Sequence, residues 1–502
     1  MDTKGKNEPT VHQRRTRVAE IADSFEWVIT ALILAFVFRA FVMEAFRIPT
    51  GSMADTLMGA HFRLCCAQCG YKYNYGFVPQ NYGMPADSMP RGFLAFSKSR
   101  CPSCGFFQPS GGAMPVAYGD RILVLKCIYE YFEPKRWDVI VFRDPLDPTI
   151  NFIKRLAGLP GETIEIIDGD VYINGQISRK PRKIQEELWM PVYDHDYQPA
   201  RPREPLFNGH VWRQPFKVAG SQWDVDPSNA TRFNLESSPE QINTMVYDTS
   251  IGNDFRTAYA YDKVREYERM PFCSDLMVRY YATFFGENCM AGISLSKYQS
   301  QYTARFETGG AMVITKSAGG GEFVELARKT VKPINTDRPT EIKFANVNHQ
   351  LIFEVGGEEL SFDMGCEPNA AGSVMAKVEP EVKIFGAGKL QLSHVVIYRD
   401  IYYTDTDGLG LCRGGSGNPF KLAKDEFFAL GDNSPDSHDS RWWNQPGKGN
   451  NGKFYREGVV PRDYLVGKAM FVYWPSGYRP YAGFPVPVIP NVGWMRFIYG
   501  GK

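Results

Sequence analysis

A serine near the start of the chain has the surroundings of an exposed nucleophile. Ser52 lies between Gly51 and Met53, in a turn that begins at Pro49. Because Gly51 has no side chain, a substrate could approach the backbone closely there. Hydrolysis of an amide needs a nucleophile, a base and hydrogen-bond donors for the developing oxyanion. We expect Ser52 to be the nucleophile, with its own amide and the Thr50 hydroxyl as the oxyanion donors.

A lysine on a predicted strand is the candidate base. A strand through residues 152–156 would place Phe152, Lys154 and Leu156 on one face. Burial on that apolar face would lower the pKa of Lys154 from about 10.4 toward the ~7–8 that a base needs near neutral pH. Arg155, on the opposite face, would supply an outward charge. The alternative for each residue alone is structural: Ser52 as a turn residue and Lys154 as an ordinary surface lysine.

A third segment, residues 431–441, is dense in short polar side chains. Within it, Ser437 or Ser440 could orient the lysine amine. A Ser/His/Asp triad would be the competing arrangement, but His438 and the aspartate after it are neighbours and would point to opposite sides of an extended chain. Four further residues of the segment are expected to hold the loop together, as turn partners and as an ion pair: Asp432, Asn433, Asp439 and Arg441.

In this order, and with Gly119-Asp120 between the first two, the three segments resemble the motifs of bacterial type I signal peptidases. These are membrane-bound endopeptidases that use a Ser/Lys dyad. The resemblance covers residues 25–60, 117–190 and 420–475. It implies that Ser52 is the nucleophile, Lys154 the general base, Ser437 the hydroxyl that positions the lysine and Thr50 the hydroxyl of the oxyanion hole. It also implies that Asp439 and Arg441 form a structural ion pair near the site.

The resemblance further implies an antiparallel β catalytic core on one or two membrane helices, and cleavage after small residues in an Ala-x-Ala pattern. Three positions depart from the family pattern: Asp55 stands where Pro is common, Phe152 where Tyr is common and Ser434 where Arg is common. None of these departures removes a catalytic group. Asp55, however, changes the turn beside the nucleophile.

The implied function is removal of signal peptides from exported proteins, through an acyl-enzyme and without a catalytic cofactor. Its partners would be signal-bearing preproteins and the lipid bilayer. Two alternatives stay open. A self-cleaving regulator with the same chemistry would need a DNA-binding head, for which residues 1–24 are too short. An inactive membrane-anchored protein would instead act through a β-sandwich, by binding an unknown partner.

The composition indicates a folded, turn-rich and mainly β protein. The 502 residues are enough for two or three domains, and 14% are aromatic, with 47 Gly and 34 Pro. The net charge of +1 gives no electrostatic footprint for nucleic acid, so no nucleic-acid partner is expected.

An apolar segment precedes the serine motif. Residues 25–46 would span roughly 33 Å as a helix, about one bilayer core. Basic residues before it, Arg14 and Arg15 among them, predict a cytoplasmic N-terminus and a catalytic domain on the outer side of the cell membrane, anchored by a single pass. A cleavable signal peptide is the alternative, but cleavage would detach Ser52 from its anchor.

The rest of the chain divides by its patterning. Short alternating strands with turn signals from about residue 196 indicate an inserted β-sandwich, loosely similar to laminin-G or concanavalin-like jelly rolls. The predicted organisation is a cytoplasmic tail (1–24), a transmembrane helix (25–46), the first part of the catalytic core (47–195) with a zinc-ribbon-like insertion (61–118), the sandwich (196–412), and the second part of the core with a C-terminal tail (413–502).

Five of the ten cysteines cluster between Cys65 and Cys104. Two Cys-x-x-Cys pairs there have the spacing of a structural, tetrahedral zinc site, and the expected ligands are Cys66, Cys69, Cys101 and Cys104. Cys65 would be a spare or competing ligand. Disulfides are the alternative, favoured by an exported location. Elsewhere, Cys273 and Cys289 are a candidate bridge.

Overall fold

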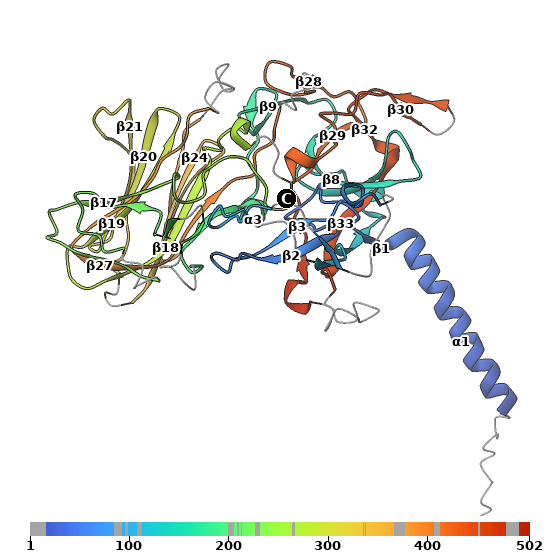
Figure 1. Cartoon of the computed structure of the whole chain (residues 1–502). Helices are drawn as coiled ribbons and strands as arrows, with labels where there is room; N and C mark the ends of the chain where they lie inside the picture. Colours follow the sequence, from blue (N-terminus) through green and yellow to red (C-terminus); the bar gives the residue numbers. More distant parts are fainter. Residues whose placement is uncertain are drawn as a thin grey trace, which may run out of the picture.

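The computed structural model describes residues 17–84, 93–95, 99–107, 113–198, 205–207, 210–211, 213–225, 231–263, 267–334, 336, 338–365, 377–405, 412–449, 452–477 and 491–501. The predicted basic tail up to residue 16, Cys366 and much of the C-terminal tail lie outside these residues. Figure 1 shows an apolar helix that projects from a body of antiparallel sheets, with a β-sandwich on the side away from the helix. The predicted mainly β class is therefore confirmed.

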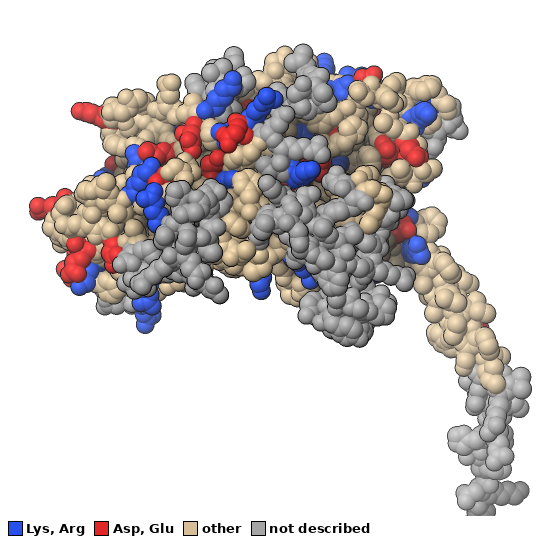
Figure 2. All heavy atoms as spheres, in the orientation of Figure 1, with Lys and Arg blue, Asp and Glu red and all other residues tan. Residues whose placement is uncertain are grey.

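The N-terminal helix is long and apolar enough to cross a membrane. Helix α1 (Arg17–Val37) continues as a π-helical turn (Phe38–Val42), and the apolar span Ile21–Val42 is 0% buried against the rest of the chain. The face of this helix seen in Figure 2 is mostly uncharged, although the span contains Asp23, Glu26 and Arg39. The predicted end at residue 46 is wrong. Residues Met43–Arg47 form strand β1, which pairs with β6, so their backbone hydrogen bonds belong to the sheet.

One large sheet holds the predicted motifs. Its strands, in order across the sheet, are β1, β6 (Arg121–Leu125), β33 (Leu465–Trp474), β7 (Val139–Arg143), β8 (Asn151–Gly158), β29 (Glu426–Leu430) and β32 (Val460–Pro461), and β34 (Arg496–Phe497) pairs with β33. All pairings are antiparallel. The sheet thus joins strands from both ends of the sequence, with the sandwich inserted between β8 and β29.

Strand β8 pairs with β7 and β29 along its two edges, and apolar clusters cover both of its faces. One face contributes Phe152 and Leu156 to a cluster with Trp443, and the other contributes Ile153 to a cluster with Val139 and Val141. From Lys154 to Gly158 every residue of β8 is buried. The position of β8 therefore fixes Lys154.

Two small sheets flank the core. One consists of β11 (Gln176–Ile177), β10 (Asp170–Ile173), β9 (Thr163–Ile167) and β28 (Phe420–Lys421). The other is the Cys-rich segment, with β3 (Lys72–Gly76), β2 (His61–Cys65), β5 (Ala113–Ala117) and β4 (Phe93–Ala95). The segment is more regular than its Gly- and Pro-rich composition predicts. Its buried Phe62, Tyr75 and Phe77 pack with the cysteines.

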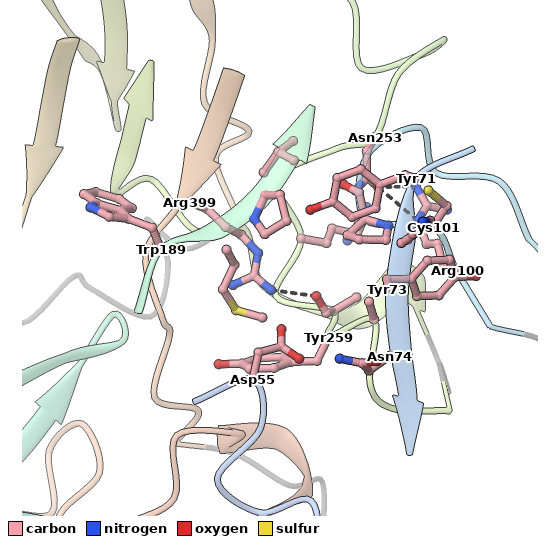
Figure 3. Close-up of a pocket in the computed structure, with 18 of the residues that line it drawn as sticks. Asp55, Tyr71, Tyr73, Asn74, Arg100, Cys101, Trp189, Asn253, Tyr259 and Arg399 are labelled. Carbon is pink, nitrogen blue, oxygen red and sulfur yellow. Dashed lines mark hydrogen bonds between the residues drawn. The ribbon is translucent and has the colours of Figure 1, made fainter. Parts of the chain in front are cut away.

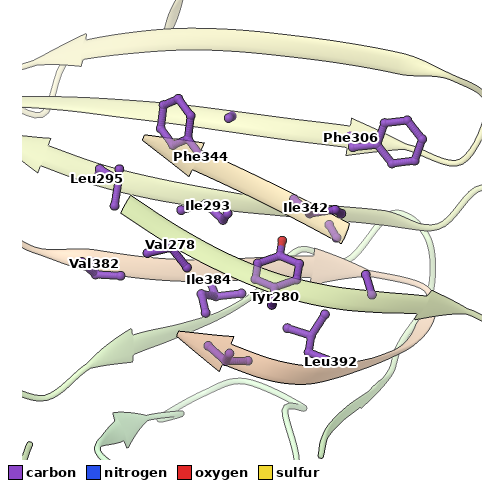
Figure 4. Packing of buried hydrophobic residues seen from close by; sticks show 14 of the residues in the cluster. Val278, Tyr280, Ile293, Leu295, Phe306, Ile342, Phe344, Val382, Ile384 and Leu392 are labelled. Carbon is purple, nitrogen blue, oxygen red and sulfur yellow. The ribbon is translucent and has the colours of Figure 1, made fainter. Parts of the chain in front are cut away.

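The inserted sandwich consists of two seven-stranded antiparallel sheets. One contains β12 (Met190–Asp194), β27 (Lys389–Arg399), β18 (Leu276–Phe284), β23 (Thr340–Val347), β24 (Gln350–Val355), β25 (Glu358–Asp363) and β16 (Phe233–Glu236). The other contains β15 (Phe216–Lys217), β17 (Asn243–Tyr247), β26 (Val382–Ala387), β19 (Met290–Lys297), β20 (Ser300–Glu307), β21 (Ala311–Ala318) and β22 (Val324–Thr330). Alternating apolar residues of both sheets meet in one core, seen in Figure 4 around Tyr280, Ile293 and Phe344.

Buried polar contacts join the sandwich to the catalytic part. Lys180, after β11, forms an ion pair of 2.7 Å with Asp400, directly after β27, and both side chains are at most 3% exposed. The proposed Cys273–Cys289 bridge is wrong. Both cysteines are free, since the thiol of Cys273 lies near the carbonyl of Asp400 and that of Cys289 near the carbonyl of Lys389.

Candidate active site

The structure brings the predicted nucleophile and base together. Lys154 Nζ lies 2.5 Å from Ser52 Oγ, although 102 positions separate the residues in the sequence. Lys154 reaches the serine from β8, while Ser52 lies in the turn that follows β1. A proton can pass between two atoms at this distance without an intervening water.

Burial lowers the pKa of the lysine amine. The Lys154 side chain is only 4% exposed, and its Nζ lies 5.9 Å from the centre of the Phe152 ring. Loss of solvation disfavours the ammonium, and this lowers the pKa of Lys154 to about 8, against the opposing attraction of the Asp439 carboxylate. A substantial fraction of the amine is therefore neutral at mildly alkaline pH.

The polar loop after β29 lies directly against the turn of residues 50–57 that holds Ser52, called the nucleophile turn below. The amide of Asn433 donates a hydrogen bond of 3.0 Å to the carbonyl of Ser52. At Gly431 a Cβ atom would lie 2.5 Å from that carbonyl oxygen and 2.2 Å from Ser437 Oγ. Only glycine permits this approach, because any side chain would push the two segments apart.

A buried ion pair missed by the sequence interpretation joins β8 to this loop. Arg155 donates to both carboxylate oxygens of Asp432, at 2.8 and 2.7 Å, and neither side chain is more than 1% exposed. The prediction that Arg155 points to solvent is wrong, because β8 is covered on both faces. Asp432 was expected to stabilise its own turn. It pairs with Arg155 and also accepts a hydrogen bond from the Thr56 hydroxyl of the nucleophile turn.

Asp439 and Arg441 form the expected ion pair. Arg441 donates to Asp439 at 2.9 and 2.8 Å, and both side chains are fully buried. The guanidinium holds the pKa of the Asp439 carboxyl below its usual range despite burial. Asp439 also accepts the amide of Gly431 at 2.9 Å. Since Asp439 is committed to Arg441, it does not orient the exposed His438, and the triad alternative finds no support.

The remaining predicted polar groups differ in their contacts. Ser437 is buried beside Gly431, but its Oγ has no hydrogen-bond partner among the described residues. Ser440 does not orient the lysine. Its Oγ accepts a hydrogen bond of 3.0 Å from the backbone amide of Ala429. Thr50 is exposed at the start of the turn. The structure therefore brings Ser437 and Thr50 near the pair without a hydrogen bond to it.

Two residues of the inserted sandwich also reach the site. The Tyr261 ring packs against Gly51, and Asp262 accepts a hydrogen bond of 2.7 Å from the Asn433 side chain. No sequence signal marks these residues, because they lie in an irregular loop far from the three motifs.

A pocket of about 260 Å³ opens beside the nucleophile turn (Figure 3). Asp55 of that turn, Asn74 of the Cys-rich segment and Tyr259 and Arg399 of the insertion line it. Arg399 is held by the carbonyls of Ala258, at 2.6 Å, and Asp400, at 3.1 Å. The wall of the pocket thus joins three parts of the chain.

The four predicted metal ligands converge. Their sulfur atoms all lie within 4.8 Å of one another, with Cys66 and Cys104 at 3.6 Å and Cys69 and Cys101 at 3.7 Å. Tetrahedral zinc with Zn–S bonds near 2.3 Å would separate its sulfurs by about 3.8 Å, whereas a disulfide needs about 2.05 Å. The geometry fits a metal and not disulfides. Cys65 is exposed and its thiol faces the carbonyl of Gly70, outside the cluster.

Comparison with known proteins supports the resemblance stated from the motifs. The family described as signal peptidase, peptidase S26, matches residues 104–213 and 390–474, which include Lys154 and the 431–441 segment but not Ser52. Signal peptidase I of Rickettsia canadensis is 31% identical over 151 residues, which are 30% of this chain and 42% of that protein. Signal peptidase I of Rickettsia prowazekii is 32% identical over 168 residues, which are 34% of this chain and 47% of that protein. The chain thus spans less than half the length of these relatives.

Two solved structures are similar to part of the chain. A galectin of Caenorhabditis elegans covers 26% of this chain and 87% of its own, at 14% identity and a TM-score of 0.19. A carbohydrate-binding module of Bacillus subtilis covers 38% of this chain and 94% of its own, at 9% identity and a TM-score of 0.21. Likenesses this weak say nothing about function.

Proposed function

We propose that this chain is a membrane-anchored serine endopeptidase that removes signal peptides from exported proteins. The observation behind the proposal is the 2.5 Å separation between Ser52 Oγ and a buried Lys154 amine. A lysine held this close to one serine, away from solvent, can act as a base, whereas a surface lysine stays protonated. The similarity to signal peptidase I proteins supports the same activity.

In the proposed reaction, neutral Lys154 accepts the proton of the Ser52 hydroxyl while Oγ attacks the scissile carbonyl carbon. The Ser52 amide and the Thr50 hydroxyl donate to the oxyanion. Collapse of this intermediate breaks the C–N bond, and the Lys154 ammonium returns its proton to the leaving amine. Lys154 then takes a proton from water while the water oxygen attacks the acyl-enzyme ester carbon. As the ester C–O bond breaks, the Lys154 ammonium returns this proton to Ser52 Oγ, which frees the signal peptide as a carboxylic acid and restores the neutral amine. Ser437 has its Oγ beside Gly431 and would orient the lysine during these steps.

The N-terminal helix would place the site close to the membrane from which its substrates emerge. We propose that Ile21–Val42 crosses the cell membrane once, with the N-terminus in the cytoplasm and the catalytic core outside. The turn with Ser52 follows the helix within ten residues, so a signal peptide leaving the bilayer would meet the nucleophile near the membrane surface. We expect the cleaved site to follow small residues in an Ala-x-Ala pattern. The alternative of an inactive binding protein leaves the Ser52–Lys154 geometry without a purpose.

We further propose a structural zinc ion on Cys66, Cys69, Cys101 and Cys104. The four thiolates would hold it in a closed tetrahedral shell, which leaves no coordination position for substrate. The ion would supply folding free energy to the Cys-rich segment and take no part in the peptidase reaction.

Cleavage of a signal-bearing precursor by the full chain in detergent tests the proposal, with the new N-terminus sequenced. Ser52→Ala and Lys154→Ala are expected to abolish cleavage while the protein stays folded. Lys421→Ala, at an exposed lysine of β28, is the matched control and should cleave like the parent. Cleavage retained by either of the first two variants would contradict the dyad.

A further inference from the structure

The inserted sandwich sends a loop into the candidate active site. Between β17 and β18 the chain leaves the sandwich, and Tyr261 packs its ring against Gly51, the residue before the nucleophile. A Cβ atom on Gly51 would lie 2.1 Å from that ring. The Tyr261 hydroxyl donates to the carbonyl of Ala60 at 2.9 Å, beyond the other end of the nucleophile turn. One tyrosine of the insertion thus contacts both ends of the turn that holds Ser52.

The next residue holds the turn from a second direction. Asp262 Oδ1 accepts a hydrogen bond of 2.7 Å from Asn433, and the same Asn433 amide group donates to the carbonyl of Gly51 at 3.2 Å. Asn433 therefore bridges the insertion, the nucleophile turn and the polar loop after β29. Asp262 Oδ2 is buried and has no hydrogen-bond partner among the described residues. A buried carboxyl group is costly without a hydrogen-bond partner, and Asp262 has this partner in Asn433, through Oδ1.

The loop is also fixed at its far side, by the Cys-rich segment. Asn253 accepts from Arg100 at 3.0 and 2.8 Å and donates to the carbonyl of Pro102 at 3.0 Å. The carbonyl of Tyr261 accepts the amide of Gly76 at 2.7 Å. These contacts tie the loop to both sides of the four-cysteine cluster. The loop is therefore anchored to the Cys-rich segment as well as to the nucleophile turn.

We infer that the insertion completes the active site, with Tyr261 and Asp262 as positioning residues for Ser52. The inference depends on the proposed peptidase function and goes beyond it, since neither residue lies in the segments that resemble signal peptidases. Neither residue touches the reacting atoms; both act through Gly51 and Asn433. A nucleophile displaced by about 1 Å can lose about 100-fold in rate, so contacts that hold the turn should affect turnover more than substrate affinity.

Paired substitutions in the full chain test this inference. Tyr261→Ala removes the ring, and we expect kcat to fall about 10- to 100-fold with little change in KM. Tyr261→Phe keeps the ring and should stay within about threefold of the parent, because only one neutral hydrogen bond is lost. Asp262→Ala removes the acceptor for Asn433 and should lower kcat, whereas Asp262→Asn keeps an oxygen at Oδ1 and should restore it.

Tyr302→Ala is the matched control. Tyr302 is 7% exposed in the core of the sandwich, on β20, and does not belong to the loop that reaches Ser52. The Tyr302→Ala substitution should lower the unfolding temperature, while kcat measured below that temperature stays at the parent value. If Tyr261→Ala does not fold, the Asp262→Ala and Asp262→Asn pair decides the question. Unchanged kcat in folded Tyr261→Ala, or equal losses in both Asp262 variants, would overturn the inference.

The two proposals fail in different ways. If the parent chain shows no Ser52-dependent cleavage, the peptidase function itself is wrong, and the inference falls with it. If the parent cleaves and Ser52→Ala does not, but the Tyr261 and Asp262 variants cleave at the parent rate, only the role of the insertion is wrong.

Discussion

The guanidinium of Arg155 donates hydrogen bonds to both carboxylate oxygens of Asp432, and neither side chain is more than 1% exposed. Arg155 follows the candidate base on β8, and Asp432 belongs to the loop that contacts the nucleophile turn. The pair therefore fixes the register between the two segments that carry the chemistry. Loss of either partner would leave an uncompensated buried charge, so the contact between β8 and this loop depends on both residues.

Removal of one partner of this pair is expected to destabilise the protein. For Arg155→Ala we predict a loss of about 3–5 kcal/mol in the free energy of unfolding, because Asp432 is left as an uncompensated buried charge. Arg328→Ala, which breaks an exposed pair with Glu325 on β22, is the control and should unfold at nearly the parent temperature. Thermal unfolding in detergent, followed by circular dichroism, measures both. Equal unfolding temperatures for the two variants would contradict this assignment.

Gly431 should tolerate no side chain. Its Cβ would lie 2.5 Å from the Ser52 carbonyl oxygen, so Gly431→Ala must move the nucleophile turn or the polar loop. We predict a fall in kcat of about 100-fold. Gly309→Ala is the control, since a Cβ there meets no atom within 4 Å. Initial rates of precursor cleavage compare the two, and full activity of Gly431→Ala would show that the close approach is not needed.

Zinc content separates the cysteines of the Cys-rich segment. We predict about one zinc per chain in the purified protein, lost in Cys66→Ser and retained in Cys65→Ser. Of these two cysteines, Cys66 belongs to the four-sulfur cluster and Cys65 does not. Elemental analysis of the dialysed protein measures the ion. Chelation should lower the unfolding temperature of the parent. A metal-free parent with four reduced thiols would exclude the site.

The acyl-enzyme should be found on Ser52. Rapid acid quenching during cleavage, followed by proteolysis and mass spectrometry, is expected to find the signal-peptide fragment as an ester on the peptide that contains Ser52. Lys154→Ala should form no such adduct. An adduct on another residue would assign a different nucleophile.

Much of the fold could be predicted from the sequence. The strands around Val139–Phe142 and the sandwich strands alternate or run apolar over four or more residues, and such patterns identify strands with little ambiguity. The Ser52–Lys154 pair was predicted because its segments resemble known motifs, not because spacing along the chain implies contact. The helix end was wrong by four residues, since an apolar run does not reveal whether its last residues pair with a strand.

Contacts between distant irregular segments could not be predicted. Arg155 was expected to face solvent, because alternation alone does not show that β8 is covered on both sides. Tyr261 and Asp262 lie in a loop whose route depends on the sandwich and on the Cys-rich segment together. The expected Cys273–Cys289 bridge failed for the same reason, as the separation of two cysteines in space is set by the sheets and not by their spacing.

The pH dependence of a single turnover tests the central claim, that Lys154 acts as a neutral base on Ser52. Since burial lowers the pKa of Lys154 to about 8, the neutral fraction, and with it the rate, should rise about tenfold per pH unit below that value and level off above it. The measurement is the rate of precursor cleavage with excess enzyme, between about pH 6 and pH 10. A rise with a midpoint near pH 8 supports the account. A flat profile, or a midpoint near the ordinary lysine pKa of about 10.4, would contradict it.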